Sequence, residues 1–275
     1  VIAGCHISFA HDIGKQCRRN FAAAGQKSIM KKRWVINTPP EWEKIDKLSK
    51  ELNCSHVIAN LLLQRGVDTA EEAHAFFNPT KEMLHDPFLM KDMDKAVLRL
   101  EKAISTEEKV MIYGDYDVDG TTAVSLVFKY LRPYSSTLDF YIPDRYDEGY
   151  GISYKGIDYA AENGVSLVIS LDCGIKAIEK IEYAKEKGID FIICDHHMRD
   201  ATLPDAVAVL DAKRSDSIYP YEHLSGCGVG FKFMQAFAKS NNFPFSDLEK
   251  LLELTAVSIA SDIVPITGEN RILAY

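Results

Sequence analysis

Val110-Met-Ile-Tyr-Gly-Asp-Tyr-Asp-Val-Asp119 is the stretch around which this sequence is organised, and Gly120-Thr-Thr-Ala123 continues it. The apolar run ends at Tyr113, and three carboxylates follow at alternate positions: Asp115, Asp117 and Asp119. No Lys or Arg stands within the stretch to neutralise them. Carboxylates this close repel one another, and a hard divalent cation relieves that repulsion because carboxylate oxygens are its preferred ligands. The stretch therefore predicts a strand followed by part of a metal site.

The length and composition limit the kinds of protein that this chain can be. A chain of 275 residues is long enough for one large domain or two smaller ones. Its 47% hydrophobic and 26% charged residues are typical of a globular protein, and no apolar stretch approaches the roughly 18–20 residues of a membrane span. The net charge of −8 argues against a broadly basic nucleic-acid-binding surface but leaves room for a local basic groove.

The cysteines favour a reducing compartment. They are scattered, with no C-x-x-C pair, at positions 5, 17, 54, 173, 194 and 227. Cys173 and Cys194 follow or end apolar runs, where buried thiols are expected. This usage suits the cytoplasm better than a disulfide framework.

Three regions follow one another along the chain. Residues 1–29 carry no sustained periodicity, and we expect them to be upstream or non-native sequence. Residues 30–105 are expected to form a small helical region, with helices over 43–52, 55–64, 69–77 and 93–105. Thr69-Ala-Glu-Glu72 is typical of a capped helix start.

From residue 106 to 275 short apolar strands alternate with helices. The strands are expected over 110–113, 138–141, 166–171, 190–194 and 206–210, and the helices over 121–131, 154–163, 175–187, 228–240 and 247–259. This alternation predicts an α/β domain, a mostly parallel sheet with helices on both faces.

The carboxylates and histidines gather where the strands end. Asp172 follows the strand that ends at Leu171, and Asp195-His196-His197 follows the strand that ends at Cys194. Asp262 follows a further apolar segment. Ligands of open α/β sheets bind beyond the carboxyl ends of the strands, so these groups and the first loop are expected at one edge. Together they provide enough ligands for two divalent ions.

Each piece has a plainer interpretation when it stands alone. The D-x-D-x-D loop is no EF-hand, because Gly120 follows the third Asp and no Glu fills the twelfth position, and it could be a solvated acidic turn. Asp172 could cap the helix that follows it, and Asp262 could cap a turn before Pro265. His196-His197 could be a hydrogen-bonded loop pair. It is their recurrence at one predicted edge that favours the metal site.

The motifs as a set resemble the DHH phosphoesterase superfamily and, within it, the RecJ-like exonucleases specific for single-stranded DNA. The resemblance rests on motifs that run in family order over about residues 110–265: Tyr113-Gly-Asp-Tyr-Asp-Val-Asp-Gly120, Ile142-Pro-Asp-Arg145, Glu148-Gly-Tyr-Gly151, Ser170-Leu-Asp-Cys-Gly-Ile175, Ile193-Cys-Asp-His-His197, Leu224-Ser-Gly-Cys-Gly-Val-Gly230 and Ala260-Ser-Asp-Ile-Val-Pro265. It implies phosphodiester hydrolysis with 5′→3′ polarity in DNA recombination and repair.

The resemblance also implies roles for single residues. The metal ligands would be Asp117, Asp119, Asp172, His196 and Asp262, with Asp172 bridging two ions and Asp115 a ligand or a supporting group. His197 would contact the scissile phosphate or orient its neighbours. Two ions can clamp the attacking and leaving oxygens of a displacement, and mixed carboxylate and imidazole ligands favour Mn²⁺, with Mg²⁺ the alternative.

Substrate contacts are less sharply indicated. Arg145 could pair with a phosphate and Tyr150 could stack on a base, although a Gly-rich turn packing on its own sheet explains Tyr150 equally well. Gly228 lies where a helix opens and could offer its N–H to a phosphate, but close helix–sheet packing would also require glycine. Lys213-Arg214 could contact phosphates or form a solvated loop.

Several expectations concern the whole protein. The family usually has Asn-Pro where Asp211-Ala212 stands, which puts a contact through that Asn in doubt. We expect a fragment that lacks the family's C-terminal substrate-gripping domain and oligonucleotide-binding fold, and that is weak or inactive alone. The resemblance implies single-stranded DNA, a single-strand-binding protein and a helicase as partners. The alternatives are a DHH phosphodiesterase acting on oligoribonucleotides or cyclic dinucleotides, and an inactive nucleic-acid-binding fragment.

Overall fold

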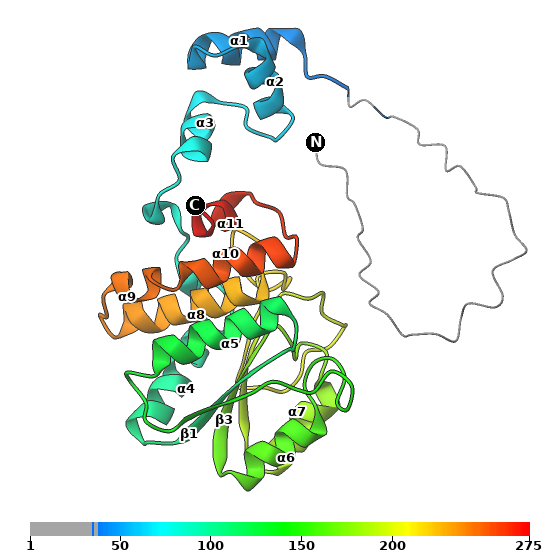
Figure 1. Ribbon diagram of the computed structural model, residues 1–275, viewed down its shortest axis with the longest axis vertical. Helices are drawn as coiled ribbons and strands as arrows, with labels where there is room; N and C mark the ends of the chain where they lie inside the picture. The colour runs from blue at the N-terminus through cyan, green and yellow to red at the C-terminus, as the bar shows by residue number, and fades with distance from the viewer. Residues whose placement is uncertain (1–34, 36–37) are drawn as a thin grey trace, which may run out of the picture.

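A computed structural model describes residue 35 and residues 38–275 of the chain (Figure 1). The segment 1–29, predicted to be upstream or non-native, lies outside the described residues. None of the helices in the described part is long and apolar enough to cross a membrane.

The centre of the molecule is a five-stranded sheet in which every neighbouring pair is parallel. The strands lie in the order β2-β1-β3-β4-β5 and comprise β1 Lys109–Gly114, β2 Leu138–Tyr141, β3 Val165–Leu171, β4 Asp190–Cys194 and β5 Ala208–Leu210. β1 and β3 are paired along their full lengths, so their carboxyl ends at Gly114 and Leu171 lie side by side. The predicted parallel α/β architecture is confirmed.

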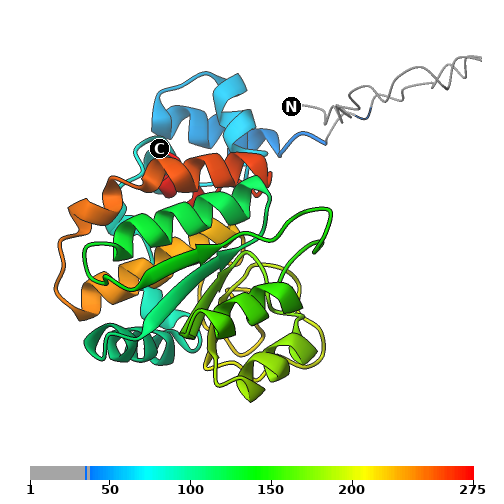
Figure 2. The same cartoon turned by 60° about the horizontal axis from the view of Figure 1, so that its bottom comes forward.

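Helices cover both faces of this sheet (Figure 2). One face packs against α4 Met93–Ser105, α5 Val118–Leu131 and α8 Gly226–Ser240, and the other against α6 Tyr154–Glu162 and α7 Ile178–Glu186. α10 Leu252–Ser261 lies on the outer side of α5 and α8. Side chains of a strand alternate between the faces, and β1 shows this directly. Val110 and Ile112 join the core under α5 and α8, whereas Met111 and Tyr113 join the core under α6 and α7.

The helices on either side of β1 create a switch in the winding of the chain. α5 connects β1 to β2 across one face, and α6 then carries the chain across the other face to β3. The first crossover leads from β1 to its neighbour on one side, and the second passes β1 over the opposite face to reach its neighbour on the other side. Such a switch opens a crevice beyond the carboxyl ends of the two central strands, and this is where open α/β sheets bind ligands.

Some boundaries differ from the prediction. α5 begins at Val118 rather than at residue 121, because Asp117 caps it by accepting the Gly120 N–H at 2.9 Å. The helix predicted over 247–259 is two helices, α9 Phe245–Glu249 and α10, since the chain turns at Lys250-Leu251. Three further short helices were not predicted: η1 Lys81–Met83, η2 Pro87–Leu89 and α11 Gly268–Leu273.

The N-terminal helices α1 Trp42–Leu52, α2 His56–Leu63 and α3 Ala70–Phe77 form a unit with a core of its own. Thr69 and Glu72 form the expected cap at the start of α3, each side chain bonding the other's backbone N–H. α4 packs on the sheet instead, burying Met93 and Leu100 in the main core. By packing, the helical unit therefore ends near Asn78, whereas the sequence pattern placed the boundary after residue 105.

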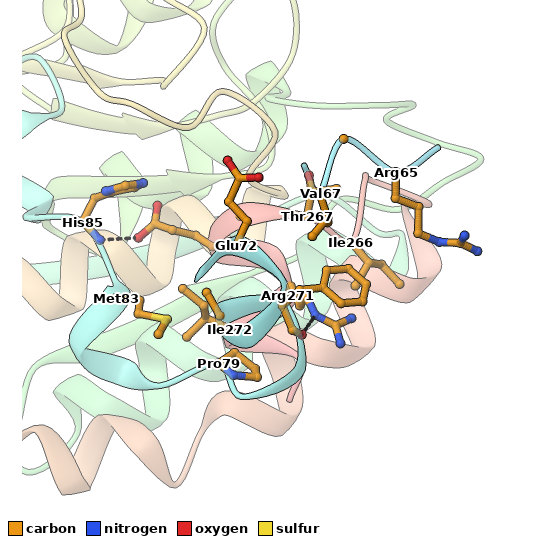
Figure 3. Close-up of a pocket in the computed structure, with 15 residues that line it drawn as sticks. Arg65, Val67, Glu72, Pro79, Met83, His85, Ile266, Thr267, Arg271 and Ile272 are labelled. Carbon is orange, nitrogen blue, oxygen red and sulfur yellow. Dashed lines mark hydrogen bonds between the residues drawn. The ribbon is translucent and has the colours of Figure 1, made fainter. Parts of the chain in front are cut away.

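A cavity of about 880 Å³ separates this helical unit from α11 (Figure 3). Arg271 spans its side, where the guanidinium donates to the Phe76 carbonyl and lies 3.7 Å from the centre of the Phe76 ring. Deeper in, Glu269 is buried against Lys232 at 2.9 Å and accepts the His85 N–H at 3.0 Å. None of the predicted metal-site residues lines this cavity.

Candidate metal centre

The predicted ligands meet at the carboxyl edge of the sheet. Asp172 follows β3, His196 and His197 follow β4, and Asp119 lies in the first turn of α5. Asp262 caps the carboxyl end of α10. Two groups of three have ligand atoms close enough for one cation each, Asp172 with His196 and His197, and Asp119 with His196 and Asp262.

His196 is the centre of this cluster. Its Nε2 lies 3.1 Å from Asp172 Oδ1, 3.7 Å from Asp119 Oδ2 and 3.7 Å from Asp262 Oδ2. Both ring nitrogens of His196 and Asp172 Oδ1 are buried without a hydrogen-bond partner in the described part of the chain. Buried polar atoms of this kind need a partner, and a carboxylate–imidazole set suits Mn²⁺ or Mg²⁺. The residues present therefore fit a divalent metal.

Burial and mutual repulsion disfavour the ionised form of Asp172 in this cluster when no cation is bound. Asp119 is 2% exposed and Asp172 1% exposed. Burial, and then the negative charges of Asp119 and Asp117, raises the pKa of Asp172 to about 10. Burial likewise raises the pKa of Asp262. A bound divalent ion would reverse this by favouring the ionised carboxylates.

Asp119 is held in place by the start of α8. Its Oδ2 accepts the Gly226 N–H at 2.7 Å, and its Oδ1 accepts the Cys227 N–H at 2.8 Å and the Ser258 hydroxyl at 2.7 Å. The amino end of a helix stabilises a negative charge, so α8 supports a carboxylate that is otherwise buried.

The Gly228 N–H is not free to bind a phosphate, which is the role that the sequence suggested for it. Gly228 is buried, and its N–H donates to Ser225 Oγ at 3.1 Å. The glycines serve close packing, since a Cβ at Gly226 would lie 2.5 Å from Asp172 Cβ. The sequence could not show that a carboxylate of the same chain faces this helix.

Asp115 and Asp117 lie at the side of the cluster. Asp115 is fully buried, with Oδ1 accepting the Tyr116 N–H at 2.6 Å and Oδ2 the Gly151 N–H at 2.9 Å. It therefore anchors the Glu148–Gly151 loop, in line with the supporting role that was one of its two expected roles. Asp117 caps α5 and is half-buried, and its charge acts on both Asp115 and Asp172.

Asp195 lies within the cluster, although the sequence interpretation gave it no role of its own. It is 1% exposed, and its Oδ1 bonds His197 Nδ1 at 2.7 Å while Oδ2 accepts the Ile175 N–H at 2.9 Å. Burial raises the pKa of Asp195, but the hydrogen bond and charge of His197, together with the N–H groups of Ile175 and His197, outweigh burial and hold this pKa below its usual range. The same bond raises the pKa of His197. Its place at the head of Asp195-His196-His197, directly after a strand, was the available signal.

Tyr150 and Arg145, the residues expected to contact substrate, lie beside the cluster. The Tyr150 hydroxyl lies 3.3 Å from His197 Nε2, and its ring meets the Tyr116 ring edge-on at 5.9 Å. The Arg145 guanidinium lies 5.3 Å from the centre of the Tyr116 ring, and its side chain is exposed. Tyr150 is half exposed, so it is not simply packed on its own sheet.

The charged side chains of the loop after β5 bond other residues of the chain. Arg214 is buried, where it bonds Asp92 at 2.6 Å and Asp216 at 2.7 Å, so the suggested phosphate contact at this position is not available. Lys213 donates to the His196 carbonyl. Asp211, which stands in place of the family's Asn, is fully buried, and burial raises its pKa to about 6.

The comparisons with known proteins concern the family and the fold. The sequence profile described as DHH family, N-terminal domain, matches residues 109–259. Among curated proteins the chain is 42% identical over 244 residues to the single-stranded-DNA-specific exonuclease RecJ of Bacillus subtilis, covering 89% of this chain and 30% of that protein. It is 32% identical to RecJ of Escherichia coli, covering 80% of this chain and 39% of that protein. The chain thus spans about a third of the length of these relatives.

Two solved structures are also similar. A crystal structure of exonuclease RecJ bound to manganese has a TM-score of 0.62 and 28% identity, covering 70% of this chain and 47% of that chain. A structure of RecJ from Thermus thermophilus in complex with Mn²⁺ has a TM-score of 0.73 and 23% identity, covering 88% of this chain and 34% of that chain, which supports the fold.

Proposed function

Because this chain belongs to the DHH family, we propose that it is the metal-bearing core of a phosphodiesterase that degrades single-stranded DNA from the 5′ end. The observation that carries the proposal is the pair of overlapping groups around His196 at the carboxyl edge of the sheet. The catalytic unit comprises residues 106–275 together with α4, which packs on the same core. DNA recombination and repair is the process in which we place it.

We propose that Asp172, His196, Asp119 and Asp262 hold two divalent ions, Mn²⁺ or Mg²⁺, with Asp117 and Asp115 completing the acidic wall. When bound, such ions make water a stronger nucleophile and stabilise the charge that develops on a phosphate under attack. Asp119 is positioned in advance by α8 and Asp115 by the Gly151 N–H, so these two carboxylates need little rearrangement when a metal binds.

His197 has a separate part in this proposal. Asp195 bonds Nδ1, which fixes the ring and leaves Nε2 as the nitrogen that faces outward toward Tyr150. Because this bond raises the pKa of His197, its ring carries a proton over a wider pH range. His197 would therefore donate from Nε2 to an oxygen of the scissile phosphate.

Tyr150 and Arg145 would receive the strand beside the metals. Tyr150 presents a half-exposed aromatic face on which a base can stack, and Arg145 presents an exposed guanidinium that can pair with a phosphate. A single-strand-binding protein and a helicase are the protein partners we propose, by resemblance. The free thiols Cys54, Cys173, Cys194 and Cys227 suit a cytoplasmic setting.

The test is degradation of 5′-labelled single-stranded DNA with Mn²⁺, beside duplex DNA, short RNA and cyclic dinucleotides. We expect preference for single-stranded DNA and a loss of more than about 100-fold in Asp172→Asn and His196→Ala, since each removes a metal ligand. Asp94→Asn, an exposed carboxylate on α4, is the matched control and should retain activity. Activity that survives Asp172→Asn, or preferred hydrolysis of a cyclic dinucleotide, would contradict the proposal.

A further inference from the structure

The cavity between the helical unit and α11 shares no residue with the metal cluster (Figure 3). Its volume of about 880 Å³ falls within the range of roughly 300–1,000 Å³ that is usual for small-molecule sites. Residues 65–76 of its wall belong to the helical unit, and residues 266–272 lead into and form α11 on the α/β domain. A ligand in this cavity would therefore touch both units at once.

Much of the wall is apolar and accessible. Met83 is 39% exposed and Ile266 54% exposed, and Phe76 and Ile272 are half-buried. Figure 3 shows Met83 and Ile272 on one side of the cavity and Ile266 on the other. Three of these four side chains are flexible and not aromatic, so the wall suits an aliphatic chain, which would lose contact with water on binding.

The acidic residues of the wall already have partners within the chain. Glu72 Oε2 accepts two backbone N–H groups at the capped start of α3, at 2.7 and 3.1 Å. Glu269 is fully buried, where it pairs with Lys232 at 2.9 Å and accepts the Tyr219 hydroxyl. Both carboxylates therefore stabilise the fold, and the cavity offers little to a cationic ligand.

The two guanidinium groups of the wall keep donors without a partner among residues 38–275. Arg65 donates to the Leu61 carbonyl through Nη1 at 3.0 Å, which leaves its Nε and Nη2. Arg271 donates to the Phe76 carbonyl through Nε, which leaves both of its Nη atoms. Figure 3 shows both guanidinium groups on the same side of the cavity as Ile266. Guanidinium groups pair well with carboxylates, so the charge of this wall is complementary to an anion.

We propose that this cavity binds an amphipathic organic anion, an aliphatic chain that carries a single carboxylate. Arg65 and Arg271 pair with the carboxylate, and the apolar wall around Met83 and Ile272 receives the chain. Because the ligand contacts both units, its binding holds α1–α3 against the α/β domain. The inference goes beyond the proposed function and involves no residue of the metal cluster.

The test measures binding of octanoate by calorimetry, without metal or DNA, to the unmodified chain and to Arg65→Gln. We expect the affinity to fall about tenfold in Arg65→Gln and to stay within about threefold in Arg65→Lys, as one charge-assisted contact predicts. Lys47→Gln is the matched control, because it removes the same charge from an exposed position of α1 that does not line the cavity. Equal affinity of Arg65→Gln and Lys47→Gln would overturn the inference.

Two further ligands separate the carboxylate from the chain. 1-Octanol lacks the charge, so it should bind about tenfold more weakly than octanoate, and equally to the unmodified chain and to Arg65→Gln. Acetate lacks the chain and should also bind more weakly, because it leaves the apolar wall empty. Octanol that binds as tightly as octanoate would overturn the assignment to an anion, and acetate that does so would overturn the assignment to an aliphatic ligand.

Hydrogen exchange shows where the ligand binds and keeps the inference apart from the proposed function. Octanoate should slow amide exchange about threefold or more in α2, α3 and α11 and leave β1 and β3 unchanged, because a ligand stabilises the segments that it joins. Slowing confined to other segments would overturn the inference. Since no DNA is present, failure here leaves the proposed function intact, and a chain that binds octanoate but cleaves no DNA contradicts the proposed function alone.

Discussion

Asp119 illustrates, at the scale of one residue, how the fold keeps a carboxylate ready for a cation. An ionised carboxylate that is 2% exposed is costly unless it is hydrogen-bonded. Two backbone N–H groups of α8 and the Ser258 hydroxyl meet that need. Asp172 has fewer such partners, and its Oδ1 has none among the described residues, so it depends most on a bound ion.

Ile263 carries backbone strain next to the metal cluster. It follows Asp262 with φ 57°, in the left-handed region that β-branched residues avoid, and its side chain is 86% exposed. We expect Ile263→Asn to stabilise the fold by about 1 kcal/mol, because Asn tolerates this conformation and little packing is lost. Urea unfolding measures the change. Ile218→Asn, at an exposed isoleucine without a positive φ, is the control and should not stabilise.

Asp216 leads to a prediction of how the free energy of unfolding depends on pH. Its bond to the buried Arg214 guanidinium lowers the pKa of Asp216 from 3.8 to about 2. A carboxyl group whose pKa is lower in the folded state stabilises the fold above its unfolded pKa and loses this effect as the pH falls. Asp216→Asn should therefore reduce the free energy of unfolding at pH 6, by at most about 1 kcal/mol because the side chain is half exposed. The difference from the unmodified chain should shrink between pH 4 and pH 2, and a constant difference would contradict the assignment.

At the scale of elements, the first turn of α8 positions two carboxylates of the metal cluster at the edge of the sheet. Its first turn lies against the end of β3 so closely that a Cβ at Gly226 would lie 2.7 Å from Asp172 Oδ1. The helix end therefore binds Asp119 and touches Asp172 at the same time.

Gly226→Ala tests this contact. We expect a loss of about 1–3 kcal/mol in the free energy of unfolding, because α8 or Asp172 must move. The rise in melting temperature on adding Mn²⁺ should also shrink, since Asp172 is displaced. Gly228→Ala is the matched control: its nearest neighbour would be Ser225 Oγ at 3.3 Å, so its stability should change by less than about 1 kcal/mol. Unimpaired stability in Gly226→Ala would show that the close approach is not required.

The sequence predicted the elements better than their contacts. Periodicity located all five strands, and the residues after β1, β3 and β4 were correctly expected at one edge, because parallel strands end on the same side. The break between α9 and α10 was missed, since a helical spacing of apolar residues continues across Lys250. The role of the amino end of α8 was missed because its partner Asp119 lies 107 residues away in the chain, where sequence spacing gives no distance. Asp195 received no role although its partner His197 is only two residues further on.

At the scale of the whole molecule, the helical unit α1–α3 and the α/β body have separate cores. The Phe76–Arg271 contact is one link between them, across the cavity of Figure 3. The metal cluster lies entirely within the body, so the helical unit can loosen without disturbing it.

Arg271→Ala tests this division. Removing the guanidinium loses a cation–π contact and a hydrogen bond, together worth about 1–2 kcal/mol. We expect faster amide hydrogen exchange in α1–α3, unchanged exchange in β1 and β3, and an unchanged response to Mn²⁺. Arg65→Ala is the control, because Arg65 lines the same cavity but its side chain bonds only the Leu61 carbonyl of the preceding helix α2 among the described residues. Faster exchange throughout the sheet would contradict two separate cores.

The most direct test of the account is diffraction at the manganese absorption edge from crystals of the chain soaked in Mn²⁺. We predict two anomalous peaks at the carboxyl edge of the sheet, within about 2.0–2.6 Å of ligand atoms from Asp172, His196, Asp119 and Asp262. In Asp172→Asn crystals at least one peak should disappear while the strands stay in place. Absence of manganese from this cluster at saturating concentration, or its binding only elsewhere, would contradict the central claim.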